Sequence, residues 1–323
     1  MRAFAGVLVG AAAAMWVAQP SRAQTSDPPP PWAFPVNPPP ERSTGPKPPN
    51  RLEHVTGSPL AYTDRQLGDG FFTADWFPGE HPPMPRIVEY GRKPATACTY
   101  CHLTSGNGGP AEAALPGLPA SYIIEQVKEF QAGRRVAAQP DMESVRGMVV
   151  EARQVNDADL AAAARYFSQL RFTSHFHIME TDTVPQTRVG DVSIYVRIPG
   201  AGSEPLGARI VEVPNDARQW ELGNPHTDFT AYVPQGSIAR GEKLVASGDG
   251  AAPCRACHGP DLRGMGNVPP LAGRSPSYLA RQLYDIQHGT RRGPTVAPML
   301  AEVAQMLPSD RIAIVAYLGS LQP

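Results

Sequence analysis

Two copies of the five-residue pattern Cys-x-x-Cys-His carry the clearest chemistry in this sequence. They read CTYCH at 98–102 and CRACH at 254–258, and together they use all four cysteines of the chain. Thiols at this spacing add across the two vinyl groups of one haem, and the adjoining histidine becomes an axial ligand of its iron. We therefore predict two covalently bound haem c groups, with these residues as thioether and iron-ligand positions: Cys98, Cys101, Cys254 and Cys257 for attachment, His102 and His258 for iron.

Three other uses of paired cysteines fit the sequence less well. Zinc sites built from two Cys-x-x-Cys pairs usually close a loop of roughly 15–20 residues, whereas 152 residues separate Cys101 from Cys254. Disulfide frameworks belong to short chains that are dense in cysteine. A thioredoxin-like pair requires a βαβ context, which neither motif has. Haem attachment is the preferred interpretation of both motifs.

The residues that follow the two motifs repeat along the chain. The offset that superposes the motifs, 156 residues, also superposes identical residues downstream, among them Leu115 and Leu271, Ser121 and Ser277, Tyr122 and Tyr278, Gln126 and Gln282, and Arg135 and Arg291. Further on, an offset of 151 superposes Met148 and Met299, Asp159 and Asp310, Tyr166 and Tyr317, and Leu170 and Leu321. A repeat of this kind predicts a duplicated haem domain.

One methionine in each copy is a candidate for the second axial ligand. Met148 and Met299 each stand 18 residues before the equivalent tyrosine, Tyr166 or Tyr317. A thioether is a weak donor that favours ferrous iron and raises the reduction potential. We therefore predict Met148 as the partner of His102 and Met299 as the partner of His258. Most methionines only fill the core, and we assign that role to Met142 and Met306.

Helical segments are expected to position these ligands. Apolar residues recur at helical spacing in five segments: 121–132, 157–170, 237–247, 277–288 and 309–321. Asn156 and Ser309 are suited to cap two of them. Between the copies, residues 192–196 and 210–213 alternate in the manner of strands. These patterns predict a mainly α protein with a small β-containing insertion at 173–236.

The N-terminal region has a different character. Residues 1–23 hold Arg2, an apolar run of about 16 residues and a small-x-small site ending at Ala23, which is typical of a cleaved signal peptide and short of the roughly 20 residues that span a bilayer. Residues 24–50 form a proline-rich arm, with eleven prolines between 28 and 50. The arm either packs against the folded body through Trp32 and Phe34 or forms a loose tail. Residues 51–81 form an aromatic, Gly/Pro-rich extension.

Both copies resemble class I cytochrome c domains, and the tandem resembles the two-haem cytochromes c of bacterial periplasms. The matching pieces are CTYCH, LPGLPASYIIEQVKEFQAGRR and VNDADLAAAARYFSQL in the first copy, and CRACHG, PPLAGRSPSYLARQLYDIQHGTRRG, APM and SDRIAIVAYLGSL in the second. The resemblance covers about residues 82–172 and 237–323, just over half of the chain. It implies two class I domains at those positions.

The resemblance also implies local contacts. Gly241 on the first helix of the second domain is expected to pack against Tyr317 on its last helix, whereas the first copy has Pro85 in place of that glycine. The carbonyl of Pro270 is expected to accept the N–H of the axial histidine, with Ala114 as its counterpart in the first copy.

Composition and resemblance together favour electron carriage. A net charge of −1 over 323 residues lacks the excess of positive charge that nucleic-acid-binding proteins carry. The leading interpretation is a periplasmic dihaem cytochrome, not an enzyme, that passes single electrons by outer-sphere transfer between periplasmic or membrane-bound redox proteins, such as a dehydrogenase donor and an oxidase or reductase acceptor of a respiratory chain. The mature chain is expected to have no transmembrane segment.

Two alternatives remain open at this point. The chain is either the cytochrome subunit of a periplasmic dehydrogenase complex or a dihaem peroxidase, which needs one haem that opens a coordination site to peroxide. Methionine in both copies argues against the peroxidase. A dihaem thiosulfate-oxidising enzyme with cysteine ligation is excluded because both motifs consume every cysteine.

Overall fold

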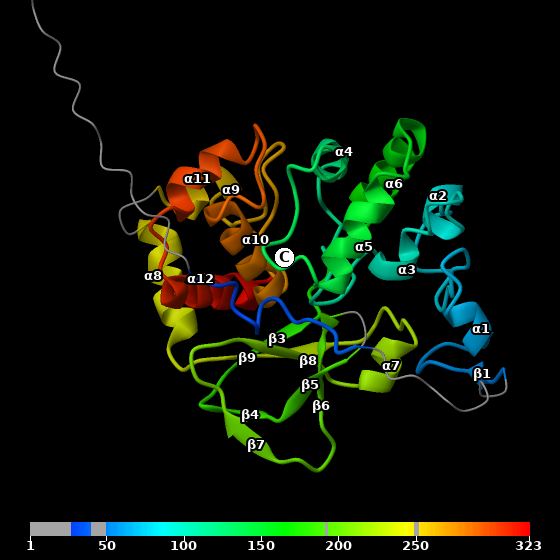
Figure 1. The fold of residues 1–323 in the computed structure, drawn as a ribbon, viewed down its shortest axis with the longest axis horizontal. Helices are drawn as coiled ribbons and strands as arrows, with labels where there is room; N and C mark the ends of the chain where they lie inside the picture. Colours follow the sequence, from blue (N-terminus) through cyan, green and yellow to red (C-terminus); the bar gives the residue numbers. More distant parts are fainter. Residues whose placement is uncertain (1–26, 40–49, 191–192, 249–251) are drawn as a thin grey trace, which may run out of the picture.

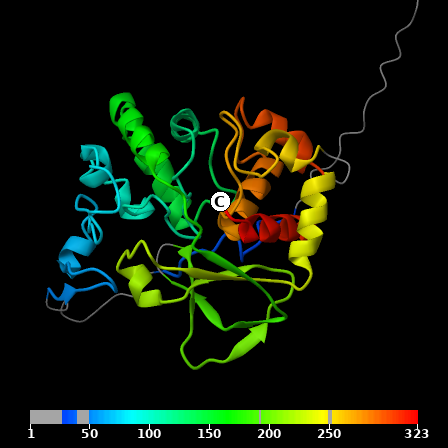
Figure 2. The same cartoon turned by 180° about the vertical axis from the view of Figure 1, so that it is seen from behind.

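The computed structural model describes residues 27–39, 50–190, 193–248 and 252–323. The predicted signal peptide and its cleavage position near Ala23 lie outside these residues. Two helical bodies stand side by side, and a layer of short strands runs beneath both of them (Figures 1 and 2). Within the described ranges, no helix has the length and apolar character needed to cross a membrane.

Each helical body contains one Cys-x-x-Cys-His motif. The first body consists of α2 (Arg86–Glu89), α3 (Thr99–His102), α4 (Ala120–Gln131), α5 (Glu143–Ala152) and α6 (Asp157–Gln169). The second consists of α8 (Ser237–Ser247), α9 (Cys254–His258), α10 (Pro276–Gln287), α11 (Ala297–Val303) and α12 (Pro308–Ser320). The motifs form α3 and α9, so each motif is a single short helix.

The five predicted helices, which are α4, α6, α8, α10 and α12, begin and end within one residue of their predicted segments. Asn156 caps α6 as expected, because its side-chain oxygen accepts the backbone N–H of Asp159 at 2.9 Å. The prediction of Ser309 as a cap is wrong: α12 begins at Pro308, and Leu307 holds the cap position. Proline suits the first helical position because its φ is already helical and the N–H that it lacks would have no partner there.

The expected contact between Gly241 and Tyr317 is present where α8 crosses α12. A Cβ added at Gly241 would lie 2.6 Å from the carbonyl carbon of Ala313 and 2.7 Å from the Cβ of Tyr317. Only a residue without a side chain lets the two backbones approach so closely. In the first body the corresponding helix, α2, has four residues and begins after Pro85, which holds its N-cap position.

Apart from one short pair in the N-terminal extension, the described strands lie in the segment between the two bodies, as predicted. Strands β3 (Phe176–Glu180), β9 (Phe229–Val233) and β8 (Val211–Pro214) form a sheet in which β3 is parallel and β8 antiparallel to β9. Two antiparallel pairs form separate two-stranded sheets: β4 (Thr183–Pro185) with β7 (Ser203–Pro205), and β5 (Thr187–Val189) with β6 (Tyr195–Arg197). Helix α7 (Ala217–Glu221) lies between β8 and β9 in the chain.

One buried cluster ties the strands to both bodies. Its members come from the proline-rich arm, the first body, the strand layer and α10: Ala33, Phe34, Ala111, Met142, Phe176, Ile194, Val196, Trp220, Phe229 and Tyr284. Because these segments share one apolar core, the strand layer and the two bodies are held in a fixed arrangement.

The described part of the arm is pinned to the body. Phe34 is 2% exposed, the carbonyl of Ala33 accepts from Arg281 at 2.9 Å, and the amide of Asn37 donates to the carbonyl of Gly190 at 2.7 Å. The alternative of a loose tail is therefore wrong for residues 27–39, because the buried phenylalanine and these hydrogen bonds fix the backbone. Residues 40–49 of the predicted arm lie outside the described ranges.

The aromatic extension covers a face of the molecule. It contains β1 (Leu52–Glu53), β2 (Tyr62–Thr63) and α1 (Asp64–Leu67). Trp76 is 1% exposed and its indole N–H donates to the carbonyl of Leu222 at 2.8 Å, next to α7. The extension thus joins the first body to the insertion.

Candidate functional site

Both motifs place two thiols and a histidine on a short helix that ends directly after the histidine. The chain leaves α3 at Leu103 with φ 63° and leaves α9 at Gly259 with φ 85°. Leu103 is an uncommon leucine in the left-handed region, where glycine is preferred. Cys101 and Cys257 are exposed, whereas Cys98 and Cys254 are half-buried. None of the four forms a disulfide, so the thiols are available for thioether bonds.

The two motif histidines are held in matching ways. The Nδ1 of His102 donates to the carbonyl of Ala113 at 3.0 Å, and the Nδ1 of His258 donates to the carbonyl of Pro269 at 2.8 Å. Each acceptor is one residue earlier than predicted from the resemblance, so Ala114 and Pro270 are corrected to Ala113 and Pro269. These two acceptors are themselves equivalent at the 156-residue offset.

This geometry leaves the other nitrogen of each ring available as a ligand. Burial lowers the pKa of His102 to about 4, partly offset by the hydrogen bond to Ala113. Burial also lowers the pKa of His258. Both rings are therefore neutral at neutral pH, with the proton on Nδ1 and a free lone pair on Nε2, which is the form that binds iron.

The candidate methionines lie on the helices that follow the middle helix of each body. Met148 lies in α5, half-buried against a small cluster that includes Val127, Phe130 and Leu160. Met299 lies in α11, half-buried beside Val296 and Val303. Met142 is 0% exposed in the central cluster, where it contacts the arm and the strands. Met306 packs against the core of the second body.

The two bodies meet through equivalent residues of the repeat. The N–H of Val136 donates to the carbonyl of Thr290 at 2.8 Å, and the N–H of Arg292 donates to the carbonyl of Arg134 at 2.9 Å. The side chains follow the same reciprocal pattern: Arg135 donates to Tyr278, and Arg291 donates to Tyr122. The interface is therefore approximately twofold, with Arg135 opposite Arg291.

Two buried guanidinium groups thus face each other at this interface. Arg135 and Arg291 are each 8% exposed, and their side chains donate to the amide oxygens of Gln126 and Gln282 and to tyrosine hydroxyls. In the described part of the chain, no ion pair links either of them to a carboxylate. Burial would raise the pKa of Tyr278, yet Arg135 and Arg291 hold it below its ordinary value.

The arginine pair is an observation on which haem can be tested. Buried charges are costly unless they are paired with an opposite charge, and the Nε of Arg291 and Nε2 of Gln126 are buried without a hydrogen-bond partner. A haem carries two carboxylates, so propionates reaching this interface would supply the missing anions and acceptors. The donor set of each motif and this unpaired positive charge both fit a haem in each body.

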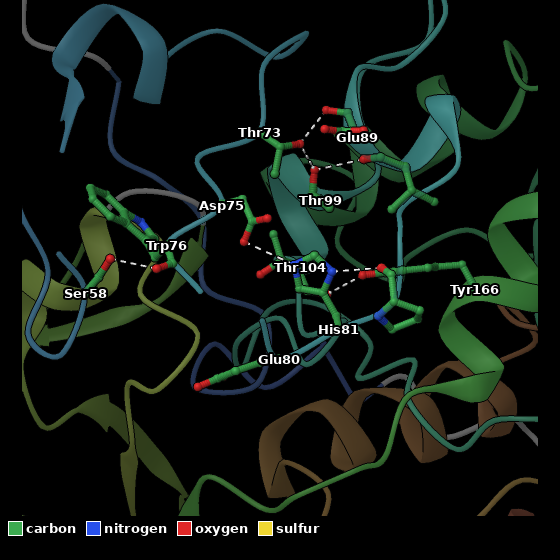
Figure 3. A network of polar contacts seen from close by, with 12 residues as sticks. Ser58, Thr73, Asp75, Trp76, Glu80, His81, Glu89, Thr99, Thr104 and Tyr166 are labelled. Atoms are coloured by element: carbon green, nitrogen blue, oxygen red, sulfur yellow. Dashed lines mark hydrogen bonds and ion pairs between the residues drawn. The ribbon is translucent and has the colours of Figure 1, made fainter. Parts of the chain in front are cut away.

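A polar network of the extension borders the first motif (Figure 3). Thr99, inside the motif, contacts Thr73 at 2.5 Å and donates to the carbonyl of Val88 at 2.9 Å. Tyr166 donates to the carbonyl of Thr104 at 3.0 Å. His81 contacts Asp75 at 3.1 Å through Nε2 and its own neighbour Pro82 at 3.0 Å through Nδ1. Both nitrogens of His81 are thus engaged, which argues against it as an iron ligand.

The remaining histidines form no metal site in the described residues. His177 on β3 and the adjacent His175 lie 3.4 and 3.8 Å from the carboxylate of Asp228, and His226 lies 2.7 Å from Glu80. No group of three or more His, Cys, Asp or Glu side chains in the described ranges has metal-binding geometry. Their surroundings indicate ordinary hydrogen bonding.

Sequence comparisons agree with this geometry. The sequence model of the family described as cytochrome c matches residues 238–322. A cytochrome c-554(548) from Halomonas halodenitrificans is 36% identical over 87 residues, which is 26% of this chain and 96% of that protein.

Two relatives align over more than two thirds of this chain. A thiosulfate dehydrogenase electron acceptor from Thiomonas intermedia is 26% identical over 233 residues, covering 70% of this chain and 79% of that protein. A cytochrome c4 from Pseudomonas aeruginosa is 23% identical over 238 residues, covering 72% of this chain and 87% of that protein.

Proposed function

We propose that this chain, which belongs to the cytochrome c family and carries electrons, carries them on two covalent haem c groups, one in each helical body. The observation that carries the second haem is the reciprocal interface. The same histidine–carbonyl bond recurs in both bodies, and in the described residues neither of the two facing arginines forms an ion pair with a carboxylate. A single haem would occupy only one of the two equivalent histidine sites.

The proposed attachment and ligand residues are those of the motifs and their methionines. Cys98 and Cys101 attach the first haem and Cys254 and Cys257 the second. His102 and Met148 bind the first iron, and His258 and Met299 bind the second. The proposed domains are 82–172 and 237–323, preceded by the signal peptide, arm and extension and separated by the insertion 173–236. Support comes from the recurrence of each element at the repeat offset.

The chain's own residues would hold the sites rigid. Haem supplies reversible one-electron chemistry at iron when it is bound. Ala113 and Pro269 fix the orientation of the two histidine rings through Nδ1. The buried clusters on α4 to α6 and around α10 and α11 would exclude water from the methionine side. Rigid ligands in both oxidation states suit outer-sphere transfer, in which no bond breaks.

The place of action is proposed to be the periplasm. Covalent haem attachment and the apolar segment before Ala23 both support export, and the cleaved chain would exchange electrons with periplasmic or membrane-bound redox proteins.

The cofactor content has a direct test in the intact mass of the mature protein. We expect the mass to exceed that of the polypeptide cleaved near Ala23 by two haem groups, because each motif forms two thioether bonds. The matched control is a Cys254→Ala, Cys257→Ala double variant, which should retain one haem. Haem that extracts into acidified organic solvent, or a mass increase of one haem in the unaltered protein, would contradict the proposal.

A second candidate function is favoured by the name of one relative. The Thiomonas intermedia protein is a thiosulfate dehydrogenase electron acceptor, and we propose a periplasmic dehydrogenase of this type as an electron donor. The test is the rate at which a thiosulfate dehydrogenase with its substrate reduces the purified chain. Reduction that saturates with chain concentration would support it, and no reduction beyond that of an unrelated cytochrome would exclude it. Copurification as a stable complex would indicate a subunit rather than a diffusing carrier.

Enzymatic peroxide chemistry is not expected. With histidine and methionine on both irons, no coordination position is open in the resting protein. The reduced protein should therefore bind carbon monoxide slowly and react slowly with peroxide, in a stopped-flow measurement on the folded chain. Fast binding at one haem without unfolding would instead favour a dihaem peroxidase.

A further inference from the structure

The loop that orients His102 is held by residues of the other body. This loop, residues 103–119 and here called the first axial loop, runs from the motif to α4 and carries the Ala113 carbonyl that accepts from His102. Two arginines of the second body, Arg274 just before α10 and Arg281 within it, donate to carbonyls of this loop on both sides of Ala113. Arg274 donates to Ala114 and, at 3.0 Å, to Pro116. Arg281 donates to Pro110 and, at 3.2 Å, to Ala111.

Both arginines are buried, and each also contacts one further segment. Arg274 is 5% and Arg281 is 2% exposed. The guanidinium of Arg274 also stacks over the ring of Phe172, 4.5 Å from its centroid, and so contacts the first body a second time. Arg281 also donates to Ala33 of the arm. In the described residues neither forms an ion pair, so backbone carbonyls are their main hydrogen-bond partners.

The insertion closes the remaining side of the first axial loop. A Cβ added at Gly109 would clash with the ring of Trp220, on α7. Asn107 contacts His175, just before β3. The loop is therefore enclosed by three segments distant in sequence, and among the described residues the side-chain hydrogen bonds to the carbonyls that flank Ala113 come from the two arginines.

The arrangement is not reciprocal, although the rest of the interface is. At the repeat offset, Arg274 corresponds to Leu118 and Arg281 to Glu125. Around Pro269, in the second axial loop (residues 259–272), the described side-chain hydrogen bonds from the first body are those of Ser121 and Glu125 with the side chain of Asn267. No guanidinium of the first body donates to a carbonyl of that loop in the described ranges.

We infer that Arg274 and Arg281 are positioning residues through which the second body fixes the His102–Ala113 hydrogen bond and thereby tunes the redox properties of the first haem. The inference rests on the proposed function, since it concerns a histidine assigned there as an iron ligand. The physical reason is the role of the Nδ1 hydrogen bond, which orients the ring and raises its basicity as a ligand. A tight bond to Ala113 favours ferric iron, and a loosened one favours ferrous iron.

The test is the Arg274→Lys variant of the full mature chain. Lysine keeps the positive charge but lacks the planar fork that reaches two carbonyls at once. Proton exchange of the histidine Nδ1–H groups is measured by NMR in the reduced state. We expect about tenfold faster exchange at His102, the size of effect that follows from losing one charged hydrogen bond, and no change at His258. The potential of the first haem should rise relative to that of the second.

The matched control is Arg311→Gln. Arg311 is also buried in the second body, at 3% exposed, and stacks over Tyr284 without contacting the first axial loop. It should reduce stability and leave both exchange rates unchanged. If Arg274→Lys does not fold, Arg281→Lys is measured in the same way.

Two outcomes would overturn the inference. Unchanged exchange at His102 in a folded variant would show that the arginines do not hold the bond, and equal acceleration at His102 and His258 would show general loosening. The proposed function is judged separately on the unaltered protein: absence of two six-coordinate haems there would contradict it, whatever the variants show.

Discussion

Replacing Met148 by alanine is expected to change the spectrum of one haem, whereas replacing Met142 by alanine is expected to weaken the fold and leave both spectra unchanged. Met148 is only half-buried at its cluster on α5, so on the proposed assignment its loss removes an axial bond and little packing. Met142 is 0% exposed. Truncating a fully buried methionine usually costs about 2–5 kcal/mol of stability through lost burial and the cavity that remains.

The two variants are compared by absorption spectroscopy and by denaturant unfolding. In Met148→Ala the far-red sulfur–iron band of one oxidised haem should disappear, the iron should become high-spin or bind an outside ligand, and its potential should fall. The opposite pattern, a lost band in Met142→Ala and a silent Met148→Ala, would show that the wrong methionine is assigned to the first haem.

The second large effect is expected at Gly241, where α8 crosses α12. The Cβ of an alanine would meet the backbone of Ala313 and the Cβ of Tyr317, and backbone cannot move aside as a flexible side chain does. Overpacking of this kind costs about 1–3 kcal/mol and sometimes more. Gly241→Ala should therefore destabilise the second body and lower the midpoint of its unfolding.

Gly147→Ala is the matched control for this prediction. Gly147 is also inside a helix, α5, but a Cβ there would have nothing within 4 Å. Alanine should stabilise that helix by about 0.5–1 kcal/mol. Equal unfolding midpoints for the two variants, measured with denaturant, would mean that the crossing of α8 and α12 is not as close as described.

Much of the fold follows from local pattern. The helical period places α4, α6, α8, α10 and α12 within a residue because their apolar faces are continuous. Errors occur where a position depends on single-residue detail. Ser309 has a suitable side chain for a cap, yet Pro308 already occupies the first turn of α12.

What the sequence does not reveal are contacts between distant segments. Glu212, a buried glutamate in β8, accepts from the Ser275 side chain at 2.7 Å and the Ser277 backbone N–H at 2.8 Å, and so caps α10 from the insertion. Nothing near Glu212 in the sequence indicates that partner. The roles of Arg274 and Arg281 are hidden for the same reason, since the repeat offers no equivalent arginines with which to compare them.

The repeat predicted more of the candidate site than composition did. It brought Arg135 and Arg291 into register, and the structure places them opposite each other. The register alone does not show that these two buried guanidinium groups face each other, because that depends on how the two bodies pack together. It is this meeting of like charges that supports two haems in the chain.

The central claim is that the chain holds two haems, each with histidine and methionine, and stores one electron on each. An anaerobic redox titration of the purified mature chain, followed by absorption, tests it most directly. The account predicts uptake of two electrons per chain in two one-electron steps, with the sulfur–iron band present on both haems when oxidised. Uptake of a single electron, or one haem that is high-spin in the resting oxidised protein, would contradict it.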